Sequence, residues 1–273
     1  MCLSSIRTGR GLSIGVVFTI LIAGSSLQGQ AVPQGQATLA AAAPQAAPAE
    51  LPSAKSIIDR HIEASGGRAA LMARSSSHVV GTLAIPANGM KGKLEIFAAK
   101  PNKMLSKTSL EGIGEILEGF DGTVGWTINP MTGPLLSSPK EVEQKKIDLD
   151  FYGDLNVEKK YKTIKTLEKT TFEGRPVYKV ALTKHDGTDD IQYFDAETGL
   201  KAGSQATRET PMGAITATVT VAEYKKFGGF LAPAKIKQST MGVEMILTFD
   251  TIEHDNVDPA VFDLPPAIKA LIK

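Results

Sequence analysis

The amino-acid sequence predicts a mostly β (α+β) protein, a half-open antiparallel β-barrel of about 11 strands with helices covering the opening. From about Ser76 onward, apolar and polar residues alternate with a period of two along many short segments. Turn signals rich in Asp and Gly separate these segments, most clearly at residues 120–126 and 194–200, which have the chemistry of β-hairpins. A sheet of so many antiparallel strands curls because each strand adds to its twist, so a barrel or part-barrel is expected.

The first 31 residues predict a secretory signal peptide rather than a part of the fold. Arg7 and Arg10 precede an apolar run at 12–23, and Gly29 and Ala31 are small residues at positions −3 and −1 of a cleavage site. The apolar run is shorter than the roughly 20 residues that span a bilayer as a helix, which favours cleavage over an inner-membrane anchor. We therefore expect an exported, periplasmic protein.

Residues 32–52 are rich in Ala, Pro and Gln and predict a flexible, disordered linker. No similar stretch follows, so residues 53–273 are expected to form one domain. The 273 residues are 42% hydrophobic, which is ample for one sizeable core. The formal net charge of +1, with no long run of one sign, argues against a nucleic-acid partner.

The only cysteine, Cys2, precedes the apolar run. The exported chain would therefore contain no disulfide, no thiolate nucleophile and no thiolate metal site. A bacterial lipoprotein needs a cysteine just after the run to carry its lipid, and none is there. A soluble exported protein is the better interpretation.

One helix is expected before the strands and one between them. Ser53 can cap a helix that runs to about Ser65, and a short helical piece is expected around 69–73. The apolar face of the first helix consists of Ile57, Ile58, His61 and Ile62. Ser138, Pro139 and Glu141 form a capping-box pattern that predicts a helix from about 139 to 149. The expected order is a leading helix, about five strands, a central helix and about six strands.

Catalytic chemistry is sparse in this sequence. None of the four histidines has metal-ligand spacing, and no nucleotide-binding or nucleophile-elbow motif is present. The histidines are His61, His78, His185 and His254, and we interpret His61 as a packed core residue. The acidic pairs Asp148/Asp150, Asp189/Asp190 and Glu115/Glu118 fit polar strand faces or helix ends as well as acid–base catalysis. We expect that the protein is not an enzyme and that it binds neither a metal ion nor a cofactor.

The positive signal is an apolar, adaptable surface. Methionines populate or flank the strands, which suits contact with varied apolar partners, although ordinary core filling explains each one alone. They are Met90, Met104, Met131, Met212, Met241 and Met245. The candidate ligand-lining residues alternate correctly on their strands, and alternation leaves open which face is concave. They are Trp126, Ile128, Val180, Leu182, Val219, Met245, Leu247 and Phe249.

Four motifs in serial order resemble the outer-membrane lipoprotein-sorting protein family, the LolA/LolB-like periplasmic carriers and their relatives. The motifs are residues 120–126, 194–200, 229–236 and 258–265, and the likeness spans 53–265. The resemblance implies a half-open barrel around a concave apolar face that shields acyl chains from water. The chain is longer than the sorting carriers, carries the Ala/Pro linker, and has no position onto which the carriers' functional arginine can be placed.

The resulting hypothesis is a periplasmic carrier that binds a lipid, a lipoprotein acyl chain or a similar apolar envelope ligand, without catalysis. Its partners would be the acylated ligand, envelope proteins and, transiently, a membrane. The alternative is an envelope protein–protein interaction module whose half-barrel is filled by side chains and holds no lipid.

Overall fold

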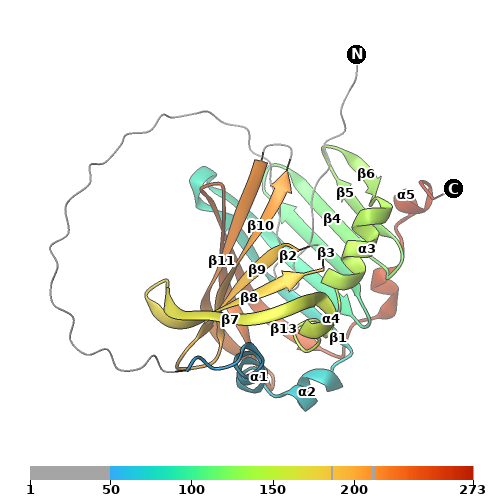
Figure 1. Cartoon of the computed structure of the whole chain (residues 1–273). Helices are drawn as coiled ribbons and strands as arrows, with labels where there is room; N and C mark the ends of the chain where they lie inside the picture. The colour runs from blue at the N-terminus through green and yellow to red at the C-terminus, as the bar shows by residue number, and fades with distance from the viewer. Residues whose placement is uncertain (1–49, 186, 211–212, 273) are drawn as a thin grey trace.

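The described residues form a single open sheet of thirteen strands, whose arrangement is drawn in Figure 1. A computed structural model describes residues 50–185, 187–210 and 213–272, so the predicted signal peptide lies outside the described residues. Within them, the strand order is β6-β5-β4-β3-β2-β1-β13-β12-β11-β10-β9-β8-β7, and every neighbouring pair is antiparallel. The edge strands β6 and β7 do not pair with each other in the described part of the chain, so the sheet remains open.

The strands are β1 Ser76–Ile85, β2 Met90–Ala99, β3 Lys103–Leu110, β4 Gly114–Phe120, β5 Gly125–Asn129, β6 Gly133–Leu136, β7 Tyr161–Phe172, β8 Arg175–Lys184, β9 Asp189–Asp195, β10 Lys201–Thr210, β11 Gly213–Phe227, β12 Phe230–Thr240 and β13 Val243–His254. The helices are α1 Ala54–Ala64, α2 Arg68–Ala73, α3 Pro139–Asp148, α4 Val157–Lys160 and α5 Pro266–Lys269, with 3₁₀ turns η1 Pro86–Asn88 and η2 Pro259–Phe262. The mostly β prediction is confirmed.

The sheet has two strands more than the predicted 11 or so. Strand β6 is only four residues long and contains Pro134, so it lacks the alternation that marks a strand. Strands β12 and β13 are joined at Met241 and Gly242, where Met241 takes a φ of 51°. Because methionine is not a typical turn residue, this hairpin has no strong turn signal in the sequence.

The predicted helix starts are confirmed. Ser53 caps α1, accepting a hydrogen bond of 3.1 Å from the Ser56 amide. The capping box of α3 is complete, because the Glu141 amide donates to Ser138 Oγ and the Ser138 amide donates to Glu141 Oε2. The short helices α4 and α5 have no comparable signal in the sequence.

The turns at residues 120–126 and 194–200 are stabilised by the side chains of Asp121 and Asp195. Asp121 accepts hydrogen bonds of 2.7 Å from the amides of Thr123 and Val124. Asp195 accepts from the amides of Glu197 and Thr198 at 3.0 and 2.8 Å. Both carboxylates therefore shape hairpins.

The predicted linker touches the fold at its last residues. Residues 50–52 are described, and the Pro52 carbonyl accepts a 2.7 Å hydrogen bond from Thr166 Oγ1 of β7. Residues 32–49 lie outside the described part of the chain.

Candidate functional site

Six of the eight candidate lining residues lie on one face of the sheet. Residues paired directly in antiparallel strands carry their side chains on the same face. One continuous row of such pairs crosses six strands, from β13 to β8: Met245, Gln238, Val219, Ser204, Gln192 and Val180. Leu247 and Phe249 follow Met245 at two-residue steps, and Leu182 follows Val180 in the same way, so they share this face, here called the inner face.

Trp126 and Ile128 lie on the opposite, outer face. Trp126 is paired with Gly119, Gly119 with Leu105, and Leu105 with Phe97. Phe97 is three residues from Leu94, which is paired with Gly81 and belongs to the inner face, so Phe97 points the other way. The structure therefore does not bring Trp126 and Ile128 together with the other six residues.

The C-terminal segment covers this part of the outer face. Phe97, Leu105 and Trp126 form one buried cluster with Phe262 of η2 and Ile268 of α5. Gly119 makes the arrangement feasible, because a Cβ there would lie 2.3 Å from the Trp126 indole. Trp126 therefore packs as an anchor of the outer-face cluster.

Helix α1 covers the inner face over β8 and β9. Its apolar residues Ile57, Ile58 and Ile62 form a buried cluster with Val180 and Leu182. His61 lies on the same helix, with its ring 5.6 Å from that of Phe194. The spacing of apolar residues in the sequence thus predicted the buried side of α1 correctly. The strands that this side contacts became known only from the structure.

The remaining four candidates bury one another at the middle of the sheet. Val219, Met245, Leu247 and Phe249 share a cluster with residues of β1, β2, β3 and β12. All six inner-face candidates have between 0% and 7% of their surface exposed. In this structure the inner face is therefore occupied by the protein's own side chains.

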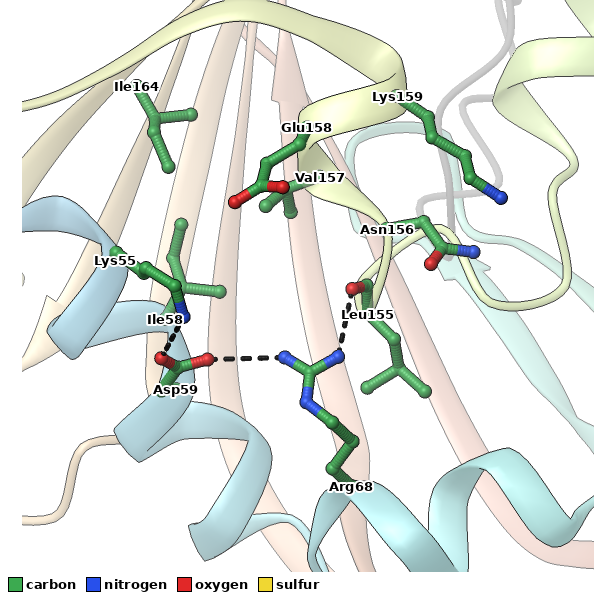
Figure 2. A pocket seen from close by; sticks show the side chains of 10 residues that line it. All are labelled: Lys55, Ile58, Asp59, Arg68, Leu155, Asn156, Val157, Glu158, Lys159 and Ile164. Atoms are coloured by element: carbon green, nitrogen blue, oxygen red, sulfur yellow. Dashed lines mark hydrogen bonds and ion pairs between the residues drawn. The ribbon is translucent and has the colours of Figure 1, made fainter.

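A cleft of about 280 Å³ opens between α1 and the segment that leads into β7 (Figure 2). Its apolar wall consists of Ile58, Leu155, Val157 and Ile164. Ile58 belongs to the cluster under α1, and the other three pack against that cluster. The cleft therefore ends on the same apolar layer that contains Val180 and Leu182.

The polar rim of the cleft links three segments of the chain. Asp59 of α1 accepts hydrogen bonds from Lys55 at 2.6 Å and from Arg68 at 3.2 Å. Arg68 also donates to the Leu155 carbonyl at 3.1 Å, as Figure 2 shows. The hydrogen bond from Lys55, together with Arg68, lowers the pKa of Asp59, so this carboxylate is ionised at neutral pH. Asn156, Glu158 and Lys159 complete the rim.

The connection from β6 to β7 passes across the inner face. Lys145 of α3 pairs with Glu118 of β4 at 2.5 Å, and Glu118 is paired with Ser106, opposite inner-face Ile96. Further along, Lys201 of β10 pairs with Asp154 at 3.4 Å. The nearby Lys201 ammonium is the main cause that lowers the pKa of Asp154. These ion pairs attach the connection to both halves of the sheet.

Two buried ion pairs lie where this connection enters β7. Lys160 is 3.0 Å from Asp148, and Lys184 is 2.9 Å from Asp190, which also accepts from the Tyr161 hydroxyl at 3.1 Å. Burial, and then the Asp190 charge, raises the pKa of Tyr161. Charged groups in the interior are tolerated when paired in this way.

The acidic pairs do not converge on a common point. Asp148, Asp190 and Glu118 are each bound to a lysine, and Asp150 accepts from the Tyr152 amide and the Asn156 side chain. Burial lowers the pKa of His61 to about 4, so its ring is neutral at physiological pH. These contacts are those of structural residues.

The described residues contain neither a metal-binding cluster nor a membrane-spanning helix. No group of three or more His, Cys, Asp or Glu residues in residues 50–185, 187–210 and 213–272 has the arrangement of a metal site. Among the helices in the same ranges, none combines the length and the hydropathy needed to cross a membrane.

Several solved structures are similar to this fold at low sequence identity. A DUF1329 family protein from Desulfovibrio piger has a TM-score of 0.53 at 12% identity, covering 77% of this chain and 97% of its own. A LolA superfamily protein from Nitrosomonas europaea has a TM-score of 0.52 at 13% identity, with coverage of 78% and 99%. A putative outer membrane lipoprotein-sorting protein domain from Vibrio parahaemolyticus has a TM-score of 0.50 at 14% identity, with coverage of 76% and 95%.

The chain therefore shares its fold with a LolA superfamily protein and with a putative outer membrane lipoprotein-sorting protein domain, which confirms the resemblance seen in the sequence motifs at the level of fold alone. No protein-family model matches the chain, and no curated protein matches it either.

The cleft residues were missed in the sequence. Arg68, Leu155 and Val157 come from short segments without long periodicity, and they meet Asp59 only through the tertiary fold. The one local signal for this cleft was the pair of opposite charges at Lys55 and Asp59, four residues apart on α1. Such pairs are common on the solvated faces of helices.

Proposed function

We propose that the chain is an exported, periplasmic binding protein for an acyl-bearing lipid or a similar apolar envelope ligand, acting without catalysis. The observation that carries the proposal is the apolar inner face under α1, reached through the cleft beside Ile58. The shared fold with a putative outer membrane lipoprotein-sorting protein domain supports this class of ligand. An acyl chain would bind where α1 now contacts Val180 and Leu182.

Helix α1 and an acyl chain would gain comparable free energies by covering this apolar face. Burying the three isoleucines of α1 contributes roughly 5–9 kcal/mol at about 1.5–3 kcal/mol each. An acyl chain that buries about ten methylenes gains roughly 8 kcal/mol at ~0.8 kcal/mol each. An acyl chain can therefore displace the apolar stripe of α1 at little net cost, which makes α1 a removable cover.

The rim contacts that hold this cover are weak. Of the two ion pairs at the rim, only the Asp59–Arg68 pair joins α1 to another segment, because Lys55 and Asp59 both belong to α1. These side chains are substantially exposed, and exposed ion pairs contribute about 0–1 kcal/mol. Opening the cleft therefore requires breaking only solvent-accessible polar contacts before the apolar layer is reached.

The first experiment is direct. The full chain is expressed, and the exported protein is purified from the periplasm and extracted under denaturing conditions for lipid mass spectrometry. We expect co-purified acylated lipid and saturable uptake of a fluorescent fatty acid. A protein that carries no lipid and takes up no fatty acid would contradict the proposal.

A single substitution tests the role of α1. Asp59→Asn removes the ion pair that joins α1 to Arg68, along with the pair to Lys55 inside the helix. Because the loss of the Arg68 pair favours opening, we expect fatty-acid affinity to rise by up to about fivefold while the melting temperature changes little. Glu143→Gln is the matched control, because it breaks an equally exposed ion pair with Lys146 far from the cleft. Equal affinities in the two variants would show that the rim does not hold α1 closed.

A second function is supported by the filled inner face. If the buried cluster around Met245 and Leu247 never opens, the domain is an interaction module that binds an envelope protein and no lipid. The same extraction and uptake measurements distinguish the two, because the module would give negative results in both.

A further inference from the structure

The edge strand β7 carries a row of exposed lysines. Lys162, Lys165 and Lys169 are exposed along β7, with Lys165 on the outer face and Lys169 on the inner face, and exposed Lys159 precedes them in α4. Residues 157–172 contain five lysines, of which only Lys160 is buried, and two glutamates, whereas the whole chain has a formal net charge of only +1. Figure 1 shows β7 as the outermost strand, beside α1. Positive charge is therefore concentrated on one edge of the sheet.

Two exposed leucines accompany these lysines. Leu167 of β7 is 42% exposed and Leu51 is 39% exposed. The hydrogen bond from Thr166 Oγ1 to the Pro52 carbonyl attaches the segment of Leu51 to β7 next to Leu167. The edge thus combines basic and apolar side chains, which is the composition of surfaces that enter the boundary between lipid headgroups and acyl chains.

Lysines on an edge strand also discourage pairing with a second sheet. That role explains the charges and leaves the exposed Leu51 and Leu167 unexplained. The opposite edge is protected differently, because β6 has no charged residue and contains Pro134, which cannot donate a ladder hydrogen bond. The chain therefore protects one edge without lysines and places several on the other.

We propose that β7 docks on an anionic lipid bilayer. The edge of the sheet points at the bilayer, so that Lys162, Lys165 and Lys169 reach headgroup phosphates from both sides of the strand, while Leu51 and Leu167 enter the interface. The charge complementarity comes from lysines spread over about 23 Å of strand, at about 3.3 Å per residue. Ile164 of β7 and Lys159 also line the cleft beside α1, so docking would place the cleft next to the bilayer.

The test measures binding to vesicles of phosphatidylcholine with and without phosphatidylglycerol. The triple variant K162Q/K165Q/K169Q should lose about 100-fold in partitioning to anionic vesicles at low ionic strength, at about fivefold per lysine. The loss should disappear at high salt, where screening removes the attraction. All variants carry the same N-terminus, so its contribution cancels in the comparison.

The matched control is K91Q/K93Q/K237Q, which removes three exposed lysines from β2 and β12 of the outer face. It changes the net charge equally and should retain most of the binding. A second comparison sets Leu167→Ser against Leu135→Ser on β6, which is 53% exposed, and only the former should weaken binding. Circular dichroism confirms that each variant is folded.

Equal losses in the two triple variants, or equal binding to neutral and anionic vesicles, would overturn the docking proposal. This result is distinct from failure of the proposed function, because fatty-acid uptake is measured without vesicles. A protein that binds vesicles through β7 and takes up no fatty acid would retain the docking surface and lose the carrier function.

Discussion

The substitution Ile58→Ala tests whether α1 opens as a cover. Ile58 is buried, lies in the cluster under α1, and also forms part of the cleft wall. Truncating a buried isoleucine costs about 2–5 kcal/mol, and the lower figure applies where neighbouring atoms can relax, as they can beside a cleft. We therefore take about 2 kcal/mol, lost from the contacts of α1 with the sheet and with the segment that leads into β7.

This loss has two linked consequences. If α1 opens locally, its opening equilibrium rises about 30-fold, because 1.4 kcal/mol corresponds to a factor of ten. A ligand that binds only the open form then gains apparent affinity by up to the same factor. We expect hydrogen exchange of the α1 amides to accelerate and the dissociation constant for a fluorescent fatty acid to fall together.

Ile268→Ala is the matched control. Ile268 is fully buried on the outer face, where it packs with Trp126 and Phe262. Its truncation should lower the stability of the protein by a similar amount and leave both α1 exchange and fatty-acid affinity near the parent values. Both variants are measured where circular dichroism shows them folded.

Two results would refute the reasoning. If Ile58→Ala accelerates α1 exchange while fatty-acid affinity falls, the ligand does not bind where α1 now lies. If α1 exchange becomes faster only in step with global unfolding, α1 is a permanent part of the core and not a cover.

Two further predictions concern the interior. Because burial lowers the pKa of His61 to about 4, the folded state binds fewer protons than the unfolded state, so stability should fall as pH drops from about 6.5 toward 4. His61→Gln should reduce this slope in denaturation midpoints. Gly119→Ala should cost about 1–3 kcal/mol and alter the fluorescence of Trp126, the only tryptophan, because the new Cβ overlaps the indole. A Cβ at Gly229 would have no neighbour within 4 Å, so Gly229→Ala should change neither the stability nor the Trp126 fluorescence.

The elements that the sequence predicted well depend on interactions between residues close in the chain. The Ser53 cap, the capping box at Ser138 and the Asp121 turn each need only partners within three residues. Alternation in β13 likewise predicted correctly that Met245 and Leu247 share a face. Such signals are local, so they persist whatever surrounds them.

The candidate site depended on contacts that no local pattern contains. Trp126 and Met245 both alternate as strand residues should, and only the pairing of thirteen strands places them on opposite faces. The cleft likewise brings Asp59, Arg68 and Leu155 together from three segments.

The sequence by itself therefore determined the class of fold, the helix starts, the turns and the residues that alternate along each strand. Only the tertiary structure decided which face is covered, by which helix, and where a cleft reaches the apolar layer beneath it. The physical reason is the period of a strand, which specifies two faces and leaves their environments to the pairing order and to the segments packed on each.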